Sequence, residues 1–525
     1  MFLLLIAIII FTYIVHYKMG RKKLVELSKK LPSDLPALPI LGHAYLFTGT
    51  DEDTMKSIQK SGKIALKHGG LATFWMANQL YLVVADPAAS EVLLKNCLEK
   101  DNNSMRFLQF LVGNGSIYSS VSIWRPRRKL LAPTFNTKKL NRFVDVFAKQ
   151  SAIMVEQLRP SVGKGTISVW KYLTTYTFDS VCETTLGVQM NAQSQPNHPF
   201  LEAFDEIAEL MSRRMVRPWL HPDWLYRILP HYQRAERCRR LIYDFVDNVI
   251  KLKRQEMEAK QREANYLPKS GNETSISFKG TKDSYLGFQS LLEMLLETSL
   301  KVKGFTDLEL REETLVMSAA GTDTSAVGAS FALVMLSRHP EVQEKVFEEL
   351  HEVLEYGDKA VTAADLPRLK YLDAVVKETL RLYPPVPIIV RLATSDTELQ
   401  SGVIIPEGTS ILLNIWAIHR DPRYWGPDAD IFKPERFFEP LTHPAQFMPF
   451  SYGLRNCLGY LYAMMSMKTV LATFLRQYRV LPPAGADPKT LKEPIRVKYE
   501  IMMKAVDKFQ LQIEPRTPQV TRTIG

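Results

Sequence analysis

The chain has 525 residues, of which 46% are hydrophobic and 23% are charged, and its net charge is +11. This composition supports a large core and excludes a disordered chain. The basic residues are spread along the sequence, with no finger, basic zipper or aromatic RNA-binding motif beside them, so no nucleic-acid partner is predicted. The four cysteines are scattered and form no CxxC pair, which argues against a disulfide framework.

The N-terminus begins with an apolar run, residues 1–17, which is followed directly by Lys18, Arg21, Lys22 and Lys23. A cleaved signal peptide has its charge before the apolar run and small residues after it, so we expect an uncleaved transmembrane anchor. The run is short for a bilayer-spanning helix, which takes about 17 to 25 residues, and a helix lying on the membrane surface is the alternative. The basic cluster predicts that everything downstream faces the cytosol.

Beyond the anchor, we expect a basic tether at residues 18–35 and then one domain at residues 36–525. Short apolar runs at residues 72–76 and 80–85 predict a β-hairpin. The periodicity is then mostly helical up to about residue 380. The sequence therefore predicts a mainly α domain with a minor β region.

Three further stretches complete this outline. Residues 260–282 are polar and predict a flexible surface loop. Residues 403–414 predict two short strands around a Pro-Glu-Gly turn, and residues 498–513 predict more short strands. Strands are thus expected from both ends of the domain.

A long helix is expected to reach Arg338, because Thr306 and Glu309 form a capping box and Pro340 stops the helix. Residues 321–325 lie near its middle and are poor helix formers. Together they cost about 2 to 3 kcal/mol relative to alanine. Such a local conflict predicts a functional site.

The residue types in this stretch suggest how the site works. Gly321 leaves a groove on the helix surface, and the Thr324 hydroxyl can bond to the Ala320 carbonyl or turn into the groove. Asp323 supplies an acid, so the set could deliver protons. The alternative is a helix kink with ordinary surface polar residues.

A second helix, ending before Pro384, carries Glu378 and Arg381 on one face. Apolar neighbours predict that the pair is buried, and a buried pair needs further hydrogen bonds to offset its desolvation. Arg436 is a candidate third member.

Cys457 lies between a glycine-containing loop and a helical run at residues 458–475. The helix N-terminus stabilises a thiolate there, and Gly453 and Gly459 permit close approach to a flat ligand. The nearest histidine, His443, is too far upstream for a zinc site. A redox-sensing or nucleophilic role stays open, but axial ligation of haem iron fits better because it needs one thiolate and no partner.

These residues resemble motifs of the cytochrome P-450 monooxygenases. Phe450-x-x-Gly453-x-Arg455-x-Cys457-x-Gly459 is similar to the haem-binding signature of that family. Four other motifs resemble family motifs in the family's order: Trp124-x-x-x-Arg128, Ala320-Gly321-x-Asp323-Thr324-Ser325, Glu378-x-x-Arg381 and Pro434-Glu435-Arg436-Phe437.

The resemblance implies the cytochrome P-450 fold, haem b as cofactor and O2 as co-substrate. It implies that Cys457 is the axial thiolate ligand of the iron and that Asp323 and Thr324 relay protons to dioxygen. It makes Glu378, Arg381 and Arg436 structural. The residues implied in cofactor binding are Trp124, Arg128, Ala320, Gly321, Arg391, Phe450, Gly453, Arg455, Cys457 and Gly459.

Within the family, residues 124–135 and 214–230 resemble the clan of fatty-acid ω-hydroxylases and insect detoxification or odorant-processing enzymes. Members of that clan often carry a glutamate that esterifies the haem, but this chain has Ala320 there, so haem without an ester link is expected. The family also tends to have polar or basic residues where Tyr460 and Leu461 stand, which argues against a reductase site at that spot.

The implied activity is insertion of one oxygen atom into an apolar substrate at the cytosolic face of the endoplasmic reticulum membrane. The chain has no flavin or dinucleotide fingerprint, so the electrons must come from elsewhere. The resemblance implies NADPH-cytochrome P-450 reductase as the electron donor, with cytochrome b5 as an optional second donor. The alternatives are a haem-thiolate isomerase or dehydratase that uses a peroxide, and a non-enzymatic membrane-tethered haem sensor or carrier.

Overall fold

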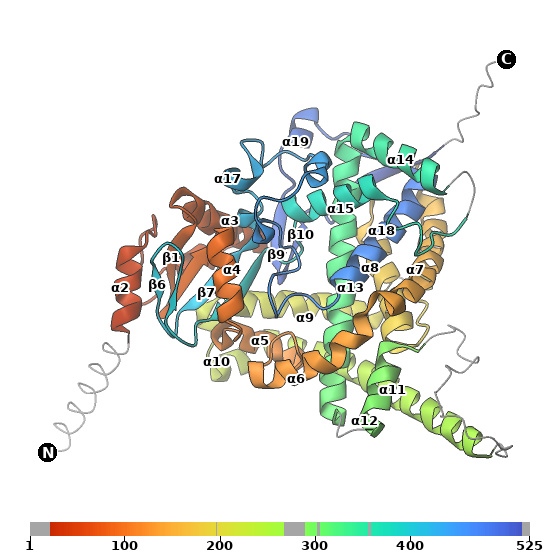
Figure 1. The fold of residues 1–525 in the computed structure, drawn as a ribbon, viewed down its shortest axis with the longest axis horizontal. Coiled ribbons are helices and arrows are strands. Elements are labelled where there is room, and N and C mark those ends of the chain that lie inside the picture. The colour runs from red at the N-terminus through yellow and green to blue at the C-terminus, as the bar shows by residue number, and fades with distance from the viewer. Residues whose placement is uncertain (1–20, 196, 267–288, 302–304, 355–358, 517–525) are drawn as a thin grey trace.

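The computed structural model describes residues 21–195, 197–266, 289–301, 305–354 and 359–516 (Figure 1). These residues form a mainly helical structure with four small sheets, which confirms the expected fold class. The apolar run predicted as an anchor lies outside the described residues. The expected tether is partly helical, because α2 occupies Lys22–Lys30.

The largest sheet confirms the predicted hairpin. β1 (Leu71–Met76) pairs antiparallel with β2 (Gln79–Val84). β2 then runs parallel to β7 (Ser410–Asn414), and β7 pairs antiparallel with β4 (Ile388–Leu392). The strand order is β1-β2-β7-β4, so segments more than 300 residues apart in the sequence share one sheet.

The two strands predicted within residues 403–414 exist but do not form a hairpin. β6 (Ile404–Ile405) pairs with β5 (Thr397–Glu398), whereas β7 joins the four-stranded sheet. The Pro-Glu-Gly turn therefore connects two different sheets.

The long helix α13 (Asp307–Arg338) crosses the middle of the domain (Figure 1). The Thr306 hydroxyl accepts from the Glu309 amide and the Glu309 carboxylate accepts from the Thr306 amide, so the predicted capping box is present. The helix continues through residues 321–325 without a break. Of the described residues, only α13 is long and apolar enough to cross a membrane, but 78% of its apolar window is buried inside the domain. It is therefore the core helix.

Three helices pack against α13 and define the surroundings of the cavity: α8 (Trp170–Val181), α15 (Lys370–Leu382) and α18 (Tyr460–Gln477). α11 extends to Tyr266, so residues 260–266 of the expected loop at 260–282 are helical, and the rest of that loop lies outside the described residues. The other helices are α3 (Asp51–Lys67), α4 (Pro87–Asn96), α5 (Asn102–Val112), α6 (Val121–Leu131), α7 (Thr137–Leu158), α9 (Pro199–Val216), α10 (Asp223–Arg227), α11 (Pro230–Tyr266), α12 (Leu291–Lys301), α14 (Pro340–Leu354), α16 (Ile415–Ile418), α17 (Pro422–Trp425) and α19 (Pro488–Lys492).

The strands predicted near the C-terminus are also present. β9 (Val497–Glu500) and β10 (Met502–Ala505) form a tight antiparallel pair. β11 (Gln510–Pro515) lies between β3 (Ile167–Ser168) and β8 (Tyr478–Leu481).

Candidate active site

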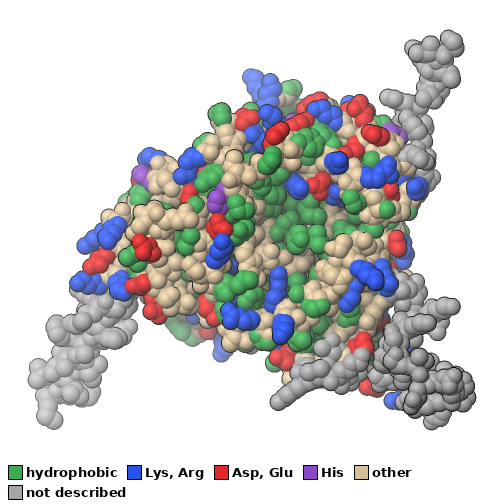
Figure 2. Space-filling model, viewed as in Figure 1, with side chains coloured by type: hydrophobic (Ala, Val, Ile, Leu, Met, Phe, Trp, Pro, Cys, Tyr) green, Lys and Arg blue, Asp and Glu red, His purple; other side chains and the backbone are tan. Residues whose placement is uncertain are grey.

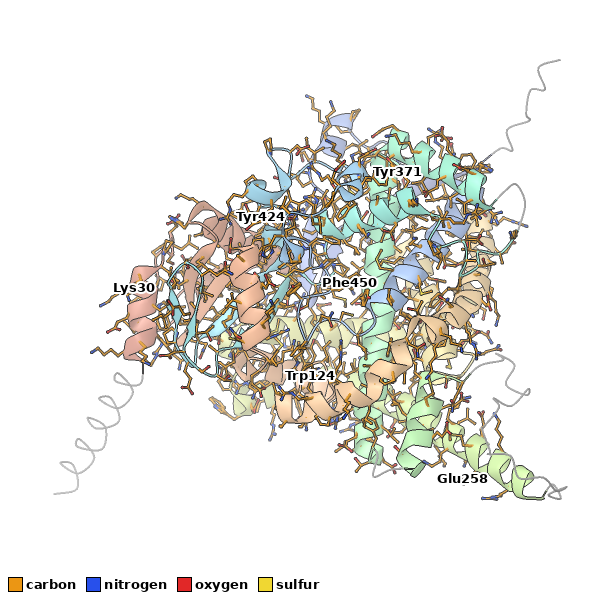
Figure 3. All side chains as sticks on the ribbon, viewed as in Figure 1. Lys30, Trp124, Glu258, Tyr371, Tyr424 and Phe450 are labelled. Atoms are coloured by element: carbon orange, nitrogen blue, oxygen red, sulfur yellow. The ribbon has the colours of Figure 1, made fainter. Side chains whose placement is uncertain are left out.

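A cavity of about 310 Å³ lies between the middle of α13, α6, β4 and the loop that carries Cys457. Figure 3 shows Phe450 of this loop beside α13, and Trp124 of α6 below it. Hydrophobic side chains gather near the middle of the same view in Figure 2. The predicted site residues that line the cavity are Trp124, Arg128, Ala320, Gly321, Thr324, Arg391, Phe450, Arg455, Cys457 and Gly459.

Cys457 occupies the cavity wall three residues before the first residue of α18. Its amide donates to the Phe450 carbonyl at 2.8 Å, which closes the loop. The thiol is enclosed by protein yet keeps accessible surface, because it faces the cavity. Burial raises the pKa of the Cys457 thiol, and the Gly459 amide and the Arg128 charge oppose that rise.

The loop before Cys457 depends on Gly453, which has a φ of +76°. A Cβ at this position would lie 3.1 Å from the Leu94 carbonyl oxygen of α4. Gly453 therefore allows the loop to pack against α4. Although it was expected to bind the cofactor, Gly453 is not among the described residues that line the cavity.

Across the cavity, one face of α13 presents Ala320, Gly321 and Thr324. The Thr324 hydroxyl donates to the Ala320 carbonyl at 2.6 Å. A Cβ at Gly321 would lie 2.8 Å from Val181 Cγ2, so the missing side chain lets α8 approach α13 closely. Asp323 is buried but points away from this face and does not line the cavity.

Three arginines on separate elements reach one end of the cavity. Arg128 donates to the backbone and side-chain oxygens of Asn456 at 2.9 and 2.8 Å. The Arg455 guanidinium lies 5.1 Å from the centre of the Trp124 ring and donates to the Leu98 carbonyl. Arg391 is 1% exposed and donates to the Val390 carbonyl. The sequence motifs thus come together in space.

Lys100 is a further cation in this wall, and the sequence analysis missed it. It lies between α4 and α5, outside every motif. Burial and the charges of Arg391 and Arg455 lower the pKa of Lys100 well below its usual value. The same burial lowers the pKa of Arg391 to about 9 and that of Arg455 to about 10.

No described acidic side chain forms an ion pair with any of these four cations. The Nε atoms of Arg391 and Arg455 are buried and have no hydrogen-bond partner among the described residues. Such a cluster is stabilised by an anion, because like charges in a buried site repel one another. Haem fits this cavity, because it is a flat, largely apolar molecule with two carboxylates and its iron can bind one thiolate.

The sequence model of the family described as Cytochrome P-450 matches residues 32–508. The chain belongs to the cytochrome P-450 family. It is therefore a monooxygenase that uses haem b and O2.

Several curated cytochromes P-450 resemble most of the chain. Cytochrome P-450 4d2 of Drosophila melanogaster is 33% identical over 494 residues, which cover 93% of this chain and 94% of the relative. Cytochrome P-450 4V2 of Mus musculus is 32% identical over 480 residues, covering 90% and 88%. The human protein of the same name is 31% identical over 455 residues, covering 86% and 84%.

In this cytochrome P-450, the predicted Glu378 and Arg381 pair is 0% exposed. Arg381 donates to both Glu378 oxygens at 2.6 and 2.8 Å, and further to the carbonyls of His419, Ala429 and Ile431. These additional bonds are what a buried ion pair needs to offset its desolvation.

Arg436 is the third member of the cluster, as expected. Its Nε lies 3.6 Å from Glu378 Oε1, which is an ion-pair distance but too long for a hydrogen bond. Its other nitrogens bind the Trp425 carbonyl at 2.9 Å and the Asp428 carboxylate at 2.8 Å. Arg436 therefore joins the segment 425–436 to α15.

His419 links this cluster to the cysteine loop, and no sequence signal identified it. Its Nδ1 lies 3.1 Å from the Arg381 carbonyl oxygen, and its Nε2 accepts from the Met448 amide at 2.9 Å. Burial lowers the pKa of His419 to about 3, so the ring is neutral and bridges the two segments. Met448 precedes Cys457 by nine residues in the same loop region.

Proposed function

We propose that this cytochrome P-450 is a membrane-bound monooxygenase that inserts one oxygen atom into an apolar substrate, with electrons from an NADPH-dependent reductase. The observation that carries the proposal is the cavity in which the Cys457 thiol faces the Ala320 and Thr324 face of α13. Haem bound through Cys457 would supply the activation of dioxygen. The chain's own residues would position the haem, exclude water and deliver protons.

The haem would be held by three features of the wall. Lys100, Arg128, Arg391 and Arg455 offer cations to its carboxylates, and Trp124 supports Arg455 through its ring. Apolar side chains line the rest of the cavity.

Ala320 offers no carboxyl group that could form an ester with the haem. Denaturing the protein should therefore release all of its haem, and haem that stays attached to the chain would contradict this assignment.

Two groups on α13 would handle protons. Thr324 lines the cavity and its hydroxyl is held by the Ala320 carbonyl. Asp323 lies on another face, where its Oδ2 is 3.2 Å from Lys504 Nζ. Lys504 Nζ is also 3.0 Å from Asp205 Oδ1, and the Asp205 side chain is 49% exposed. We propose that protons pass from solvent at Asp205 through Lys504 to Asp323, which then supplies the Thr324 side of the helix.

The substrate would be apolar. Ile117, Val316, Met317, Val386 and Ile389 line the cavity beyond the thiol, and such walls favour lipids, terpenoids or xenobiotics over sugars and nucleotides. Fatty acids, odorants and other apolar compounds are candidate substrates for a screen.

We further propose that the protein lies at the cytosolic face of the endoplasmic reticulum membrane, held by residues 1–17. The described surface supports a membrane contact, because Ile40, Trp224 and Ile228 are 91%, 72% and 73% exposed. Arg217 Nη2 donates to the Gly49 carbonyl at 2.8 Å, so the chain leading into α10 lies near the segment that follows the N-terminus. Asn114 begins an Asn-x-Ser sequon, which is glycosylated only on the lumenal side of the membrane, so glycosylation at Asn114 in intact cells would contradict this topology.

Reconstitution tests the activity. Purified protein mixed with NADPH-cytochrome P-450 reductase, NADPH and apolar substrates should form hydroxylated product and consume O2. Product from a lipid hydroperoxide but none with NADPH and reductase would favour the peroxide isomerase or dehydratase instead. Haem binding without any product from either system would favour the sensor or carrier.

A further inference from the structure

Glu313 is the only acidic residue among the described residues that line the cavity. Its side chain is 0% exposed. It belongs to α13, on the face that also carries Val316, Ala320 and Thr324. A carboxyl group in an apolar wall is a specific polar contact for whatever enters the cavity.

The two oxygens of Glu313 have very different surroundings. Oε1 accepts from the Ser116 amide at 2.9 Å, from the Ser116 hydroxyl at 2.8 Å and from Arg127 Nη1 at 3.0 Å. Oε2 is buried and has no hydrogen-bond partner among the described residues. A buried carboxyl oxygen without a donor is unfavourable, so a donor from a ligand would be stabilising there.

The charge around Glu313 also favours a donor. Arg127 pairs with Glu309 at 3.2 Å, with Glu312 at 3.0 Å and with Glu313 at 3.0 Å, so one guanidinium serves three carboxyl groups. Burial raises the pKa of Glu313. A second anion would be repelled by this group, whereas a hydroxyl can donate to it.

The position of Glu313 sets the distance between the polar end of a substrate and the groove at Ala320 and Thr324. It precedes Ala320 by seven residues, which is about 10 Å along a helix at 1.5 Å per residue. Val316 and Met317 line the wall between them. An apolar chain lying along this face could therefore contact Glu313 at one end and reach the Ala320 and Thr324 groove at the other.

We propose that Glu313 is a specificity-determining residue that accepts a hydrogen bond from a substrate hydroxyl at Oε2. The preferred substrate is an apolar molecule that carries a hydroxyl group about 10 Å from the carbon to be oxidised. This inference rests on the proposed monooxygenase function. The Glu313 carboxyl group would disfavour binding of a substrate that carries a free carboxylate at that end.

The test compares 1-decanol with its methyl ether, 1-methoxydecane, which keeps the oxygen but cannot donate, and with decanoate. Binding to the haem-loaded full-length protein is followed by the ligand-induced shift of the haem absorption band. We expect 1-decanol to bind about 10-fold more tightly than the other two, with a shift toward the high-spin form and oxidation near the chain end remote from the hydroxyl.

Glu313→Gln should remove most of the preference for 1-decanol over the ether. Glu312→Gln is the matched control, because Glu312 contacts the same Arg127 and also accepts from the Asn114 amide, but it does not line the cavity. This control should keep the preference. If Glu313→Gln fails to hold haem, the wild-type comparison still decides the question.

Three results would overturn the inference: equal affinities of the wild type for 1-decanol and the ether, an unchanged ratio in Glu313→Gln, or a low-spin shift showing the hydroxyl at the iron. Failure of the monooxygenase proposal itself would be distinguishable. In that case the ferrous protein with CO would lack the red-shifted absorption band of a thiolate-ligated haem, or no product would form with reductase.

Discussion

Asp323 Oδ2 lies 3.2 Å from Lys504 Nζ, so this acid, which precedes Thr324 in the sequence, is held on the side of α13 that faces β10 and α9. This oxygen is buried and makes no hydrogen bond of good geometry with any described residue, so its contact with Lys504 is an ion pair without good alignment. The arrangement places one lysine between Asp323 and the half-exposed Asp205.

Asp323→Asn should lower kcat by about 10-fold or more, because a positioned acid typically contributes at least about 10²-fold to a proton transfer. Haem content and substrate affinity should stay unchanged, and the solvent isotope effect on kcat should rise. Asp247→Asn is the control, since Asp247 also pairs with a residue of α13, Arg311, at a part-buried site outside the cavity lining. Equal isotope effects in wild type and Asp323→Asn would remove Asp323 from the proton route.

The stability of the wild type should depend on pH through Asp323. Burial raises the pKa of Asp323 to about 6, from an ordinary value of 3.8. The folded state then binds more protons than the unfolded state between these values, so stability falls as pH rises through that window and is level above about 7. Melting temperatures of wild type and Asp323→Asn should be measured from about pH 4 to 8. As the pH rises through this range, the melting temperature of the wild type should fall relative to that of the variant. The opposite slope would contradict the assignment.

Thr324→Ala should increase the hydrogen peroxide released per NADPH consumed, because its hydroxyl is a polar group that α13 presents to the cavity beside Ala320. Thr324→Ser should restore most of the coupling. Thr322→Ala is a useful control, since Thr322 is a buried threonine of the same helix that does not line the cavity. Peroxide yields in Thr324→Ala that match the control would exclude Thr324 from proton delivery.

Lys100→Met should speed the transfer of haem to an excess of apomyoglobin several-fold, because one cation would be lost from the wall that we propose to bind the haem carboxylates. Lys95→Met, at an exposed lysine of α4, is the control and should leave the transfer rate unchanged. Identical rates in both variants would show that Lys100 does not contact the haem.

Glu378→Gln should give little haem-loaded protein, because removing one partner of a fully buried ion pair costs about 3 to 5 kcal/mol. The Arg381 guanidinium would be left without its anion, and the His419 bridge to Met448 would lose its support. Arg159→Ala, at an exposed pair with Glu156, should change stability by no more than about 0.5 kcal/mol. Normal haem yield from Glu378→Gln would contradict the structural role.

The sequence was most informative where a motif is short and local. The order of glycines and arginine around Cys457, the capping box at Thr306 and the pair Glu378 and Arg381 each fix their own geometry within a few residues. The structure then brings Arg128, Arg391 and Arg455 to one cavity, as the resemblance to the family implied.

Other parts of the site depend on contacts between distant segments. Lys100 and His419 lie in no motif. Only the folded chain shows that Lys100 lines the cavity and that His419 contacts the Arg381 carbonyl. The turn signal between β6 and β7 is local and predicted both strands, whereas their pairing partners lie on other strands far along the chain. Glu313 could have been found from the sequence, since helical periodicity places it on the face of Ala320 and Thr324.

The central claim is that the Cys457 thiolate ligates haem iron, and the ferrous CO spectrum tests it most directly. Reduced wild-type protein with CO should show the strongly red-shifted Soret band of a thiolate-ligated haem, and Cys457→His should lose that band even where haem is retained. A red-shifted band that survives in Cys457→His, or a wild type whose band is that of a nitrogen-ligated haem, would contradict the account.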